Sequence, residues 1–274
     1  MQGRIIKIIS NDYTVLSNDK EYICKSRGLF RNQNIKPVVG DLVEFDDNNN
    51  YILNILPRKN SLIRPLVSNI EQALIVSNVK PTFDTNLLDK LLCIIEYNNI
   101  KPILCFTKLD LLNDLELEEI NIYIEYYKKI GYTVFVNSEI DKIKKIFKDK
   151  ITVFTGQTGA GKSTLINKLD SNFNLETGEI SKALGRGKHT TRHVELHKIH
   201  NGLVADTPGF SSVSFIDMSK QDIRDNFIEF NEYKDKCKFR DCMHENEIIC
   251  EVKNKVKENQ IIKSRYDNYI KFIK

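Results

Sequence analysis

Residues 151–169 have the sequence ITVFTGQTGAGKSTLINKL, which contains the most informative motif of the chain. Residues 151–155 are mostly apolar and predict a buried strand, and residues 164–169 predict a helix. Between them the sequence matches the phosphate-loop pattern G-x-x-x-x-G-K-[ST] at every fixed position. Glycines let the backbone wrap around phosphates, so that successive amides point inward at a helix N-terminus. The motif therefore predicts a nucleotide-binding loop.

The residues of this loop have distinct expected roles. We expect Lys162 to reach the β- and γ-phosphates and to act in catalysis, and the Ser163 hydroxyl to ligate Mg²⁺. A chance glycine-rich turn is the alternative, but such a turn has no need of a strand before it and a helix after it. The predicted nucleotide-binding residues of the loop and the helix start are Gly156, Gln157, Thr158, Gly159, Ala160, Gly161, Lys162, Ser163 and Thr164.

A second phosphate-related motif lies further along the chain. Residues 202–204 predict a short strand, and Asp206-Thr207-Pro208-Gly209 follows its end. In phosphate-loop enzymes an Asp at this place positions Mg²⁺, and the Gly amide senses the γ-phosphate. We therefore expect Asp206 to ligate Mg²⁺ and Gly209 to contact the nucleotide. For an isolated Asp-x-x-Gly, a plain turn is the alternative.

Strands and helices alternate from about residue 69 onward. Such alternation predicts a parallel sheet with helices on both faces. In this α/β architecture, ligands bind beyond the carboxyl ends of the strands. The predicted strands cover 73–76, 102–106, 132–136 and 151–155, and the predicted helices cover 86–97, 116–130 and 139–147. Past residue 215 the pattern becomes helical and polar, which predicts a further helix over 222–233.

The strand 102–106 ends in Thr107-Lys108-Leu109-Asp110, which resembles the guanine-reading Asn-Lys-x-Asp element of GTPases, with Thr107 in the place of Asn. A buried Asp110 carboxylate can accept two hydrogen bonds from N1 and N2 of guanine, which adenine cannot supply. Thr107, Lys108 and Asp110 are thus the predicted base-binding residues. A solvated Lys-Leu-Asp at a helix start is the alternative.

The order of these motifs is unusual. The base reader at 107–110 precedes the phosphate loop at 156–163 and Asp-x-x-Gly at 206–209, whereas in the ordinary GTPase the base reader comes last. We interpret the chain as circularly permuted, because the sheet needs only the same strands in the same places. The loop that senses the γ-phosphate then runs directly into the C-terminal segment, which gives the nucleotide state a route to that segment.

Short runs of alternating apolar and polar residues, broken by turns rich in Asn and Asp, fill residues 3–60. They predict a small all-β domain. A barrel of the oligonucleotide-binding type fits, since about five strands in some 60 residues must close on themselves to bury one core. A generic β-domain without a ligand is the alternative.

Three of the six cysteines crowd together near the C-terminus. Cys237, Cys242, His244 and Cys250 supply three thiolates and one imidazole, a set suited to tetrahedral Zn²⁺ in a closed structural site. We predict one structural Zn²⁺ per chain, which would stabilise a helical segment of low apolar content. Scattered free thiols are the alternative.

Composition and charge are those of an ordinary globular chain. The 274 residues carry a net charge of +4 and 41% hydrophobic residues, enough for a sizeable core. No apolar run approaches the roughly 20 residues that span a bilayer, so we expect a cytoplasmic protein without a membrane partner. Thiols stay reduced in that compartment, and we expect Cys24, Cys93 and Cys105 to be buried small hydrophobic residues.

Basic residues cluster in two places. Lys and Arg can neutralise RNA phosphates, and Tyr rings can stack on unpaired bases. RNA contact is therefore one interpretation of these clusters, and a solvated helix face is the other. The first cluster is Arg186, Lys188 and Arg192, and the second is Lys253, Lys255, Lys257, Lys263, Arg265, Lys271 and Lys274, with Tyr266 and Tyr269 between them.

The permuted order, the Gly-Gln-Thr-Gly-Ala-Gly-Lys-Ser loop, Asp-Thr-Pro-Gly and the Cys-x4-Cys-x-His-x5-Cys cluster resemble the ribosome small-subunit-dependent GTPase A family over essentially the whole chain. The resemblance implies a multidomain α/β protein with an oligonucleotide-binding-type β-barrel at 1–64, a circularly permuted GTPase domain at 65–214 and a small helical zinc-binding domain at 215–274. It implies a monomeric GTPase that hydrolyses GTP to GDP and phosphate with Mg²⁺. It also implies that the small ribosomal subunit and its rRNA are partners, that the subunit stimulates hydrolysis, and that the protein assists late maturation of the subunit.

The resemblance also bears on catalysis. Similar family members carry His-Thr-Thr where this chain has His189-Thr190-Thr191, which suggests that His189 positions the nucleophilic water and that Thr190 or Thr191 contributes to Mg²⁺ binding. Ras-like GTPases place a water-orienting Gln directly after Asp-x-x-Gly, whereas this chain has Phe210, whose ring cannot orient water. A Gly- and Lys-rich loop with a solvated histidine is the alternative.

Two other functions fit parts of the sequence. An ATP-dependent phosphate-loop enzyme would share residues 156–163, but it gives no reason for Thr107-Lys108-Leu109-Asp110. A zinc-containing RNA-binding protein with a vestigial nucleotide site would share the barrel and the cysteine cluster.

Overall fold

The computed structural model describes residues 1–26, 36–63, 66–173, 194–205 and 214–274. Its internal contacts divide the chain into two compact units. Unit 1 comprises Met1–Leu74 and Ser138–Phe210, and unit 2 comprises Ile75–Asn137 and Ser211–Lys274. The domain boundaries expected from the sequence, after residues 64 and 214, stay predictions.

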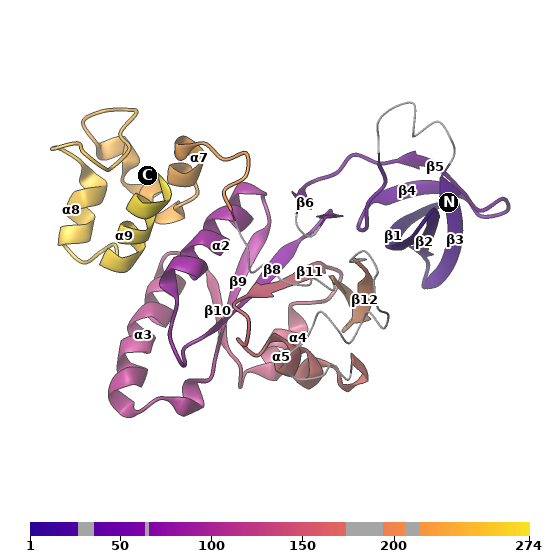
Figure 1. Ribbon diagram of the computed structural model, residues 1–274, viewed down its shortest axis with the longest axis horizontal. Coiled ribbons are helices and arrows are strands. Elements are labelled where there is room, and N and C mark those ends of the chain that lie inside the picture. Colours follow the sequence, from indigo (N-terminus) through magenta and orange to yellow (C-terminus); the bar gives the residue numbers. More distant parts are fainter. Residues whose placement is uncertain (27–35, 64–65, 174–193, 206–213) are drawn as a thin grey trace. The chain divides into compact units, whose positions relative to one another are not determined.

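The first five strands form a closed barrel in the order β1-β2-β3-β5-β4, drawn in indigo to violet in Figure 1. Neighbouring strands pair antiparallel, except β3 and β5, which pair in parallel. Apolar residues from all five strands, among them Val15, Phe45 and Ile52, fill the interior. The predicted oligonucleotide-binding type of barrel is confirmed. The strands are β1 Gln2–Ile9, β2 Asp12–Ser17, β3 Lys20–Ser26, β4 Leu42–Asp46 and β5 Tyr51–Ile55.

A two-stranded ribbon of β6 (Ser61–Ile63) and β7 (Leu66–Ser68) follows the barrel. The fully buried Asp41 ties the two together, because its carboxylate accepts hydrogen bonds from Arg58 Nε at 2.7 Å and from Ser68 Oγ at 2.6 Å. The chain thus leaves the barrel along a fixed path.

Six strands form a second sheet in the order β10-β9-β8-β11-β13-β12. β8 is buried along its whole length, as expected for a strand covered on both faces. β10 pairs in parallel with β9, and β11 with β13, so the predicted α/β sheet is confirmed. β12 pairs antiparallel with β13 and was not expected. The strands are β8 Gln72–Asn78, β9 Lys101–Thr107, β10 Thr133–Val136, β11 Ile151–Gly156, β12 Leu196–Ile199 and β13 Gly202–Ala205.

The helices between these strands begin where capping residues allow. α2 (Thr85–Tyr97) starts after Asp84, whose carboxylate accepts a hydrogen bond from the Leu87 amide at 2.9 Å. α3 (Asp114–Lys129) starts with a capping box between Asn113 and Glu116. Unit 1 contributes α4 (Ile140–Lys145), α5 (Lys162–Leu169) and the short 3₁₀ helix η2 (Ser171–Phe173).

The C-terminal segment is more interrupted than its sequence suggests. A single helix over 222–233 was predicted, but α7 (Lys220–Asp225) ends at Asn226 and the 3₁₀ helix η3 (Ile228–Glu232) follows. The break lets the rings of Phe227 and Phe230 stack on each other, 5.3 Å apart, inside the core. The remaining elements are η4 Lys234–Lys236, α8 Glu251–Lys257 and α9 Lys263–Phe272.

This segment has an apolar core of its own, against the expectation of low apolar content. Phe227, Phe230, Val252, Ile261 and Tyr269 are all at most 1% exposed. Burial of such side chains stabilises the fold, so a metal ion would add to this core rather than replace it.

Among the described residues, no helix combines the length and the apolar character needed to cross a membrane.

Candidate functional site

The phosphate loop has the geometry that its glycines predict. β11 ends at Gly156, and Gly159 and Gly161 adopt left-handed backbone angles, with φ of +75° and +88°. A Cβ added at Gly159 or Gly161 would meet no atom within 4 Å, so the backbone angle, and not lack of space, requires glycine there. α5 begins at Lys162, which places the first amides of the helix at the loop, where they favour an anion.

Lys162 lies where a phosphate-binding lysine is expected. Its Nζ donates hydrogen bonds to the carbonyl oxygens of Gly156 at 2.8 Å and Gln157 at 2.7 Å. Burial lowers the pKa of this lysine to about 8. Ser163, the predicted Mg²⁺ ligand, is buried beside it, whereas the neighbouring Thr164 is exposed. The loop therefore brings together an ammonium group, a buried hydroxyl and the amides at the start of a helix.

The predicted base reader lies in unit 2, at the carboxyl end of β9. Thr107 is 3% exposed, Lys108 has a left-handed φ of +64°, and Asp110 lies in the 3₁₀ helix η1 (Leu109–Leu111). A lysine rarely adopts such a backbone angle, and unusual angles cluster at functional sites. Asp110 is exposed, against the expectation of a buried carboxylate, because the 3₁₀ turn carries it away from the packed end of the strand.

Several predicted site residues lie outside the described residues. They are His189, Thr190, Thr191, Asp206 and Gly209, together with the basic residues Arg186, Lys188 and Arg192. Their roles stay predictions.

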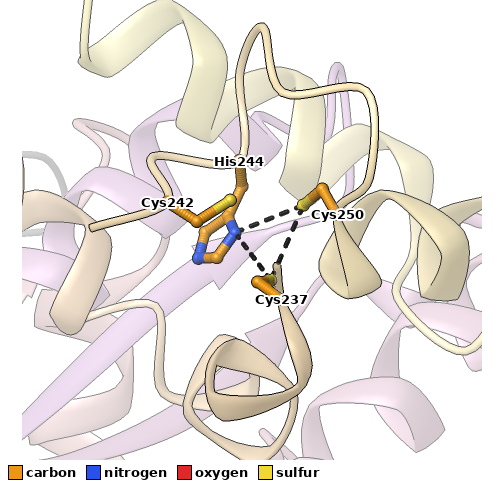
Figure 2. Close-up of side chains that lie close together, drawn as sticks. All are labelled: Cys237, Cys242, His244 and Cys250. Carbon is orange, nitrogen blue, oxygen red and sulfur yellow. Dashed lines mark hydrogen bonds between the residues drawn. The ribbon is translucent and has the colours of Figure 1, made fainter. Parts of the chain in front are cut away.

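The four predicted zinc ligands converge, as Figure 2 shows. Their candidate ligand atoms all lie within 4.8 Å of one another. The Sγ atoms of Cys237 and Cys250 are 3.9 Å apart, and His244 Nδ1 lies 3.7 Å and 3.3 Å from them. Tetrahedral Zn²⁺ with Zn–S bonds of about 2.3 Å separates two thiolates by about 3.8 Å, so the donor set fits that ion.

The electrostatics of this site also favour a cation. Burial raises the pKa of the Cys242 and Cys250 thiols, so their thiolates need a compensating charge. Burial, helped by Arg224, lowers the pKa of His244 to about 4. The imidazole is therefore neutral at pH 7, as metal binding requires. Its Nδ1 faces the thiols, and its buried Nε2 has no partner among the described residues.

The residues that fix the loop between Cys242 and Cys250 were not predicted from the sequence. The Glu247 carboxylate accepts hydrogen bonds from the amides of Met243 at 2.7 Å and Glu245 at 2.8 Å. Lys253 Nζ donates to the carbonyl oxygens of Glu245 and Glu247, and the Tyr266 hydroxyl donates to the His244 carbonyl at 2.7 Å. The sequence offers a weak local signal for Glu247, which is one of two acidic residues between His244 and Cys250, but nothing in the spacing marks Tyr266.

The structure corrects the predicted RNA-binding role of two tail residues. Arg265 is 1% exposed, and its guanidinium binds Asp89 on α2 at 2.7 Å and both carboxylate oxygens of Glu229. Tyr269 is fully buried, and its hydroxyl donates to the Met243 carbonyl. Neither side chain can reach a phosphate or a base, because both belong to the packing of α9 against its own unit.

Comparisons with known proteins identify the family. The model of the RsgA GTPase matches residues 55–216, and that of the RsgA N-terminal domain matches residues 2–52. The Small ribosomal subunit biogenesis GTPase RsgA 2 of Oceanobacillus iheyensis is 52% identical over 99% of this chain and 96% of its own. The Small ribosomal subunit biogenesis GTPase RsgA of Bacillus subtilis is 45% identical over 99% and 96% of the two chains.

Two solved structures resemble the chain over nearly its whole length. YloQ, described as a circularly permuted GTPase, is 40% identical with a TM-score of 0.85 and covers 99% of this chain and 93% of its own. YjeQ from Thermotoga maritima is 33% identical with a TM-score of 0.87, over 99% and 96%. The permuted order inferred from the motifs is thereby confirmed. With family models, full-length relatives and solved structures in agreement, the chain belongs to the RsgA GTPase family.

Proposed function

We propose that this protein binds the small ribosomal subunit and assists its late maturation, hydrolysing GTP to GDP and phosphate. The observation that carries the proposal is the full-length similarity to relatives whose names state small ribosomal subunit biogenesis. The phosphate loop supports it independently, since left-handed glycines, a buried Ser163 and Lys162 stand at the start of α5.

In this proposal the nucleotide is held at both ends. The loop 156–163 and Thr164 bind the phosphates, and Gly209 contacts the γ-phosphate. Thr107, Lys108 and Asp110 bind guanine. Each segment follows the carboxyl end of a strand, β11 for the phosphate loop and β9 for the base reader, which is where ligands bind in α/β sheets.

Magnesium would be held by Ser163, Asp206 and either Thr190 or Thr191. When bound, Mg²⁺ would neutralise the negative charge that develops on the phosphates. The chain supplies the other positive charge through Lys162, whose ammonium can move from the loop carbonyls to the phosphates.

We place His189 as the residue that orients the attacking water, because Phe210 cannot do so. His189→Ala is expected to lower GTP turnover while leaving the dissociation constant of GDP unchanged. Single-turnover hydrolysis and GDP binding, measured on both proteins, test this role. Equal turnover in the two proteins would remove His189 from the mechanism.

The Cys237, Cys242, His244 and Cys250 cluster is proposed to hold one structural Zn²⁺. The protein is further proposed to act as a cytoplasmic monomer and to contact rRNA. Because phosphate contacts release counterions, its association with the subunit should weaken as salt rises.

The decisive experiment compares GTP hydrolysis with and without purified small ribosomal subunits. Stimulation by the small subunit, and not by the large subunit at equal concentration, is the expected result. Turnover that is the same in all three conditions would favour an RNA-binding protein with a vestigial nucleotide site.

A further inference from the structure

The base reader is bordered by a segment that the nucleotide motifs do not include. After β8 the chain passes through Val79 and Lys80, which both lie in unit 2. The Val79 amide donates a hydrogen bond to the Thr107 carbonyl at 3.2 Å. This bond fixes the turn after β8 directly beside the first residue of the base reader.

The backbone carbonyl of Lys80 accepts hydrogen bonds from two side chains. Asn78 Nδ2 lies 2.6 Å from it and Lys108 Nζ lies 3.3 Å from it. A carbonyl can only accept, so the nitrogen of the Asn78 amide must face it. Asn78 is 2% exposed, which makes this contact a fixed part of the fold. The side chain of Lys108, the second residue of the base reader, is therefore anchored to the turn after β8.

The side chain of Lys80 reaches the other end of the segment that connects β9 to α3. Its ammonium forms an ion pair with the carboxylate of Glu116, in the first turn of α3. The other oxygen of Glu116 accepts a hydrogen bond from the Asn113 amide at 3.1 Å, and the Glu116 amide donates to Asn113 Oδ1 at 3.0 Å. Glu116 is thus held by the capping box while it holds Lys80.

Lys80 therefore contacts both ends of the segment from Lys108 to Glu116, which carries Asp110. Asp110 itself is exposed in η1, and an exposed carboxylate on an unrestrained loop loses conformational freedom when it binds a base. Fixing the loop beforehand lowers that entropic penalty. The ion pair is about one-third exposed on each side, so its effect is expected to be modest.

We propose that Lys80, through its ion pair with Glu116, is a positioning residue that sets the selectivity of the site for guanine. It holds the segment from Lys108 to Glu116 so that the Asp110 carboxylate meets N1 and N2 of the base together. This inference rests on the proposed GTP-binding function and deepens it. In this proposal Lys80 and Glu116 act through Asp110 and not through contacts of their own with the nucleotide.

The test compares GDP with IDP, whose hypoxanthine base lacks the 2-amino group. Misplacing Asp110 weakens the contact to that group, which only GDP makes. Lys80→Met and Glu116→Gln are each expected to raise the dissociation constant of GDP about two- to fivefold, the range of an exposed ion pair. IDP binding should change less, so the preference for GDP over IDP falls. Glu116→Gln keeps a side chain able to complete the capping box.

The matched control is Lys128→Met, which removes an exposed ion pair with Glu125 from the same helix α3. It should leave both dissociation constants unchanged. The double variant Lys80→Met/Glu116→Gln should be no weaker than either single variant, because both remove one interaction.

The proposal is overturned if the variants weaken GDP and IDP binding equally, since that indicates a general loss of structure, or if they leave both unchanged. A wild-type protein that binds ADP as well as GDP would instead contradict the proposed function. The two failures are therefore distinguishable.

Discussion

The ammonium group of Lys162 links the phosphate loop to a measurable pH dependence. Burial lowers its pKa to about 8 in the free protein, and bound phosphates must raise it again. Below pH 8 the lysine is charged before and after binding. Above pH 8 the free protein must take up a proton to bind, so affinity falls.

We therefore expect the affinity for GDP to fall about tenfold between pH 7 and pH 9. Titration calorimetry in buffers of different ionisation enthalpy would show the accompanying proton uptake. Lys162→Arg, whose guanidinium stays protonated, should give a flat profile over the same range. A flat profile in the wild-type protein would show that Lys162 does not titrate there.

Loss of the Arg265 side chain should strongly destabilise unit 2. Its guanidinium is buried between Asp89 and Glu229, and it lies 4.6 Å from the centre of the Phe227 ring. Removing it leaves two buried carboxylates without their cation. Arg265→Met should lower the free energy of unfolding by about 3–5 kcal/mol.

Urea denaturation followed by circular dichroism measures this loss. Lys271→Met changes an exposed residue of the same helix α9 and should stay within about 0.5 kcal/mol of the wild type. A similar small change for Arg265→Met would mean that the buried network contributes little.

Arg265 shows why the contacts of a single residue can be impossible to predict from the sequence. In the sequence it is one of many tail cations, and its partners Asp89 and Glu229 lie 176 and 36 positions away. No local pattern carries that information. The phosphate loop and the zinc ligands were predictable because their chemistry requires fixed residue types at short spacing.

Among the elements, α8 begins directly at one of the proposed zinc ligands. Cys250 is the N-cap of α8, and its Sγ accepts the Lys253 amide at 3.5 Å. Zn²⁺ at this thiolate would fix the helix start. Cys250→Ser should reduce bound zinc from about one per chain to near zero and speed hydrogen exchange in residues 237–257.

Metal analysis and hydrogen-exchange mass spectrometry measure the two effects. The control variant is Cys105→Ala, which changes a buried thiol of β9. It should bind as much zinc per chain as the wild type. Because Phe227, Phe230 and Tyr269 form an apolar core, the segment should loosen and not unfold completely. Unchanged exchange in residues 237–257 after zinc loss would contradict a structural role for the ion.

Most strands and helices of the α/β part were predicted to within two residues, and two features of the chain were missed. α2 and β9 were each predicted to within one residue of the observed bounds. β12 was missed, although a hairpin joins it to β13: His200 and Asn201 connect the two strands, and Asn directly before Gly202 is a strong hairpin signal. The break after α7 was missed because Phe227 and Phe230 fit a helical spacing, and only tertiary packing shows that they stack.

For the molecule as a whole, the order of the motifs carried the most information. A base reader ahead of a phosphate loop predicted a permuted GTPase, and the similarity to YloQ confirmed that arrangement. The five-stranded barrel followed from alternation and turns. The division into two compact units was beyond sequence reasoning, because it cuts through β8 between Leu74 and Ile75.

We propose that Asp110 selects guanine among the nucleotides that this protein can bind. The most direct test is competition binding of GDP, ADP and XDP to the wild type and to Asp110→Asn. The wild type should prefer GDP, and Asp110→Asn should lose that preference and gain affinity for XDP, whose 2-oxo group suits an amide donor. Equal binding of ADP and GDP by the wild type, or an unchanged preference in Asp110→Asn, would contradict the claim.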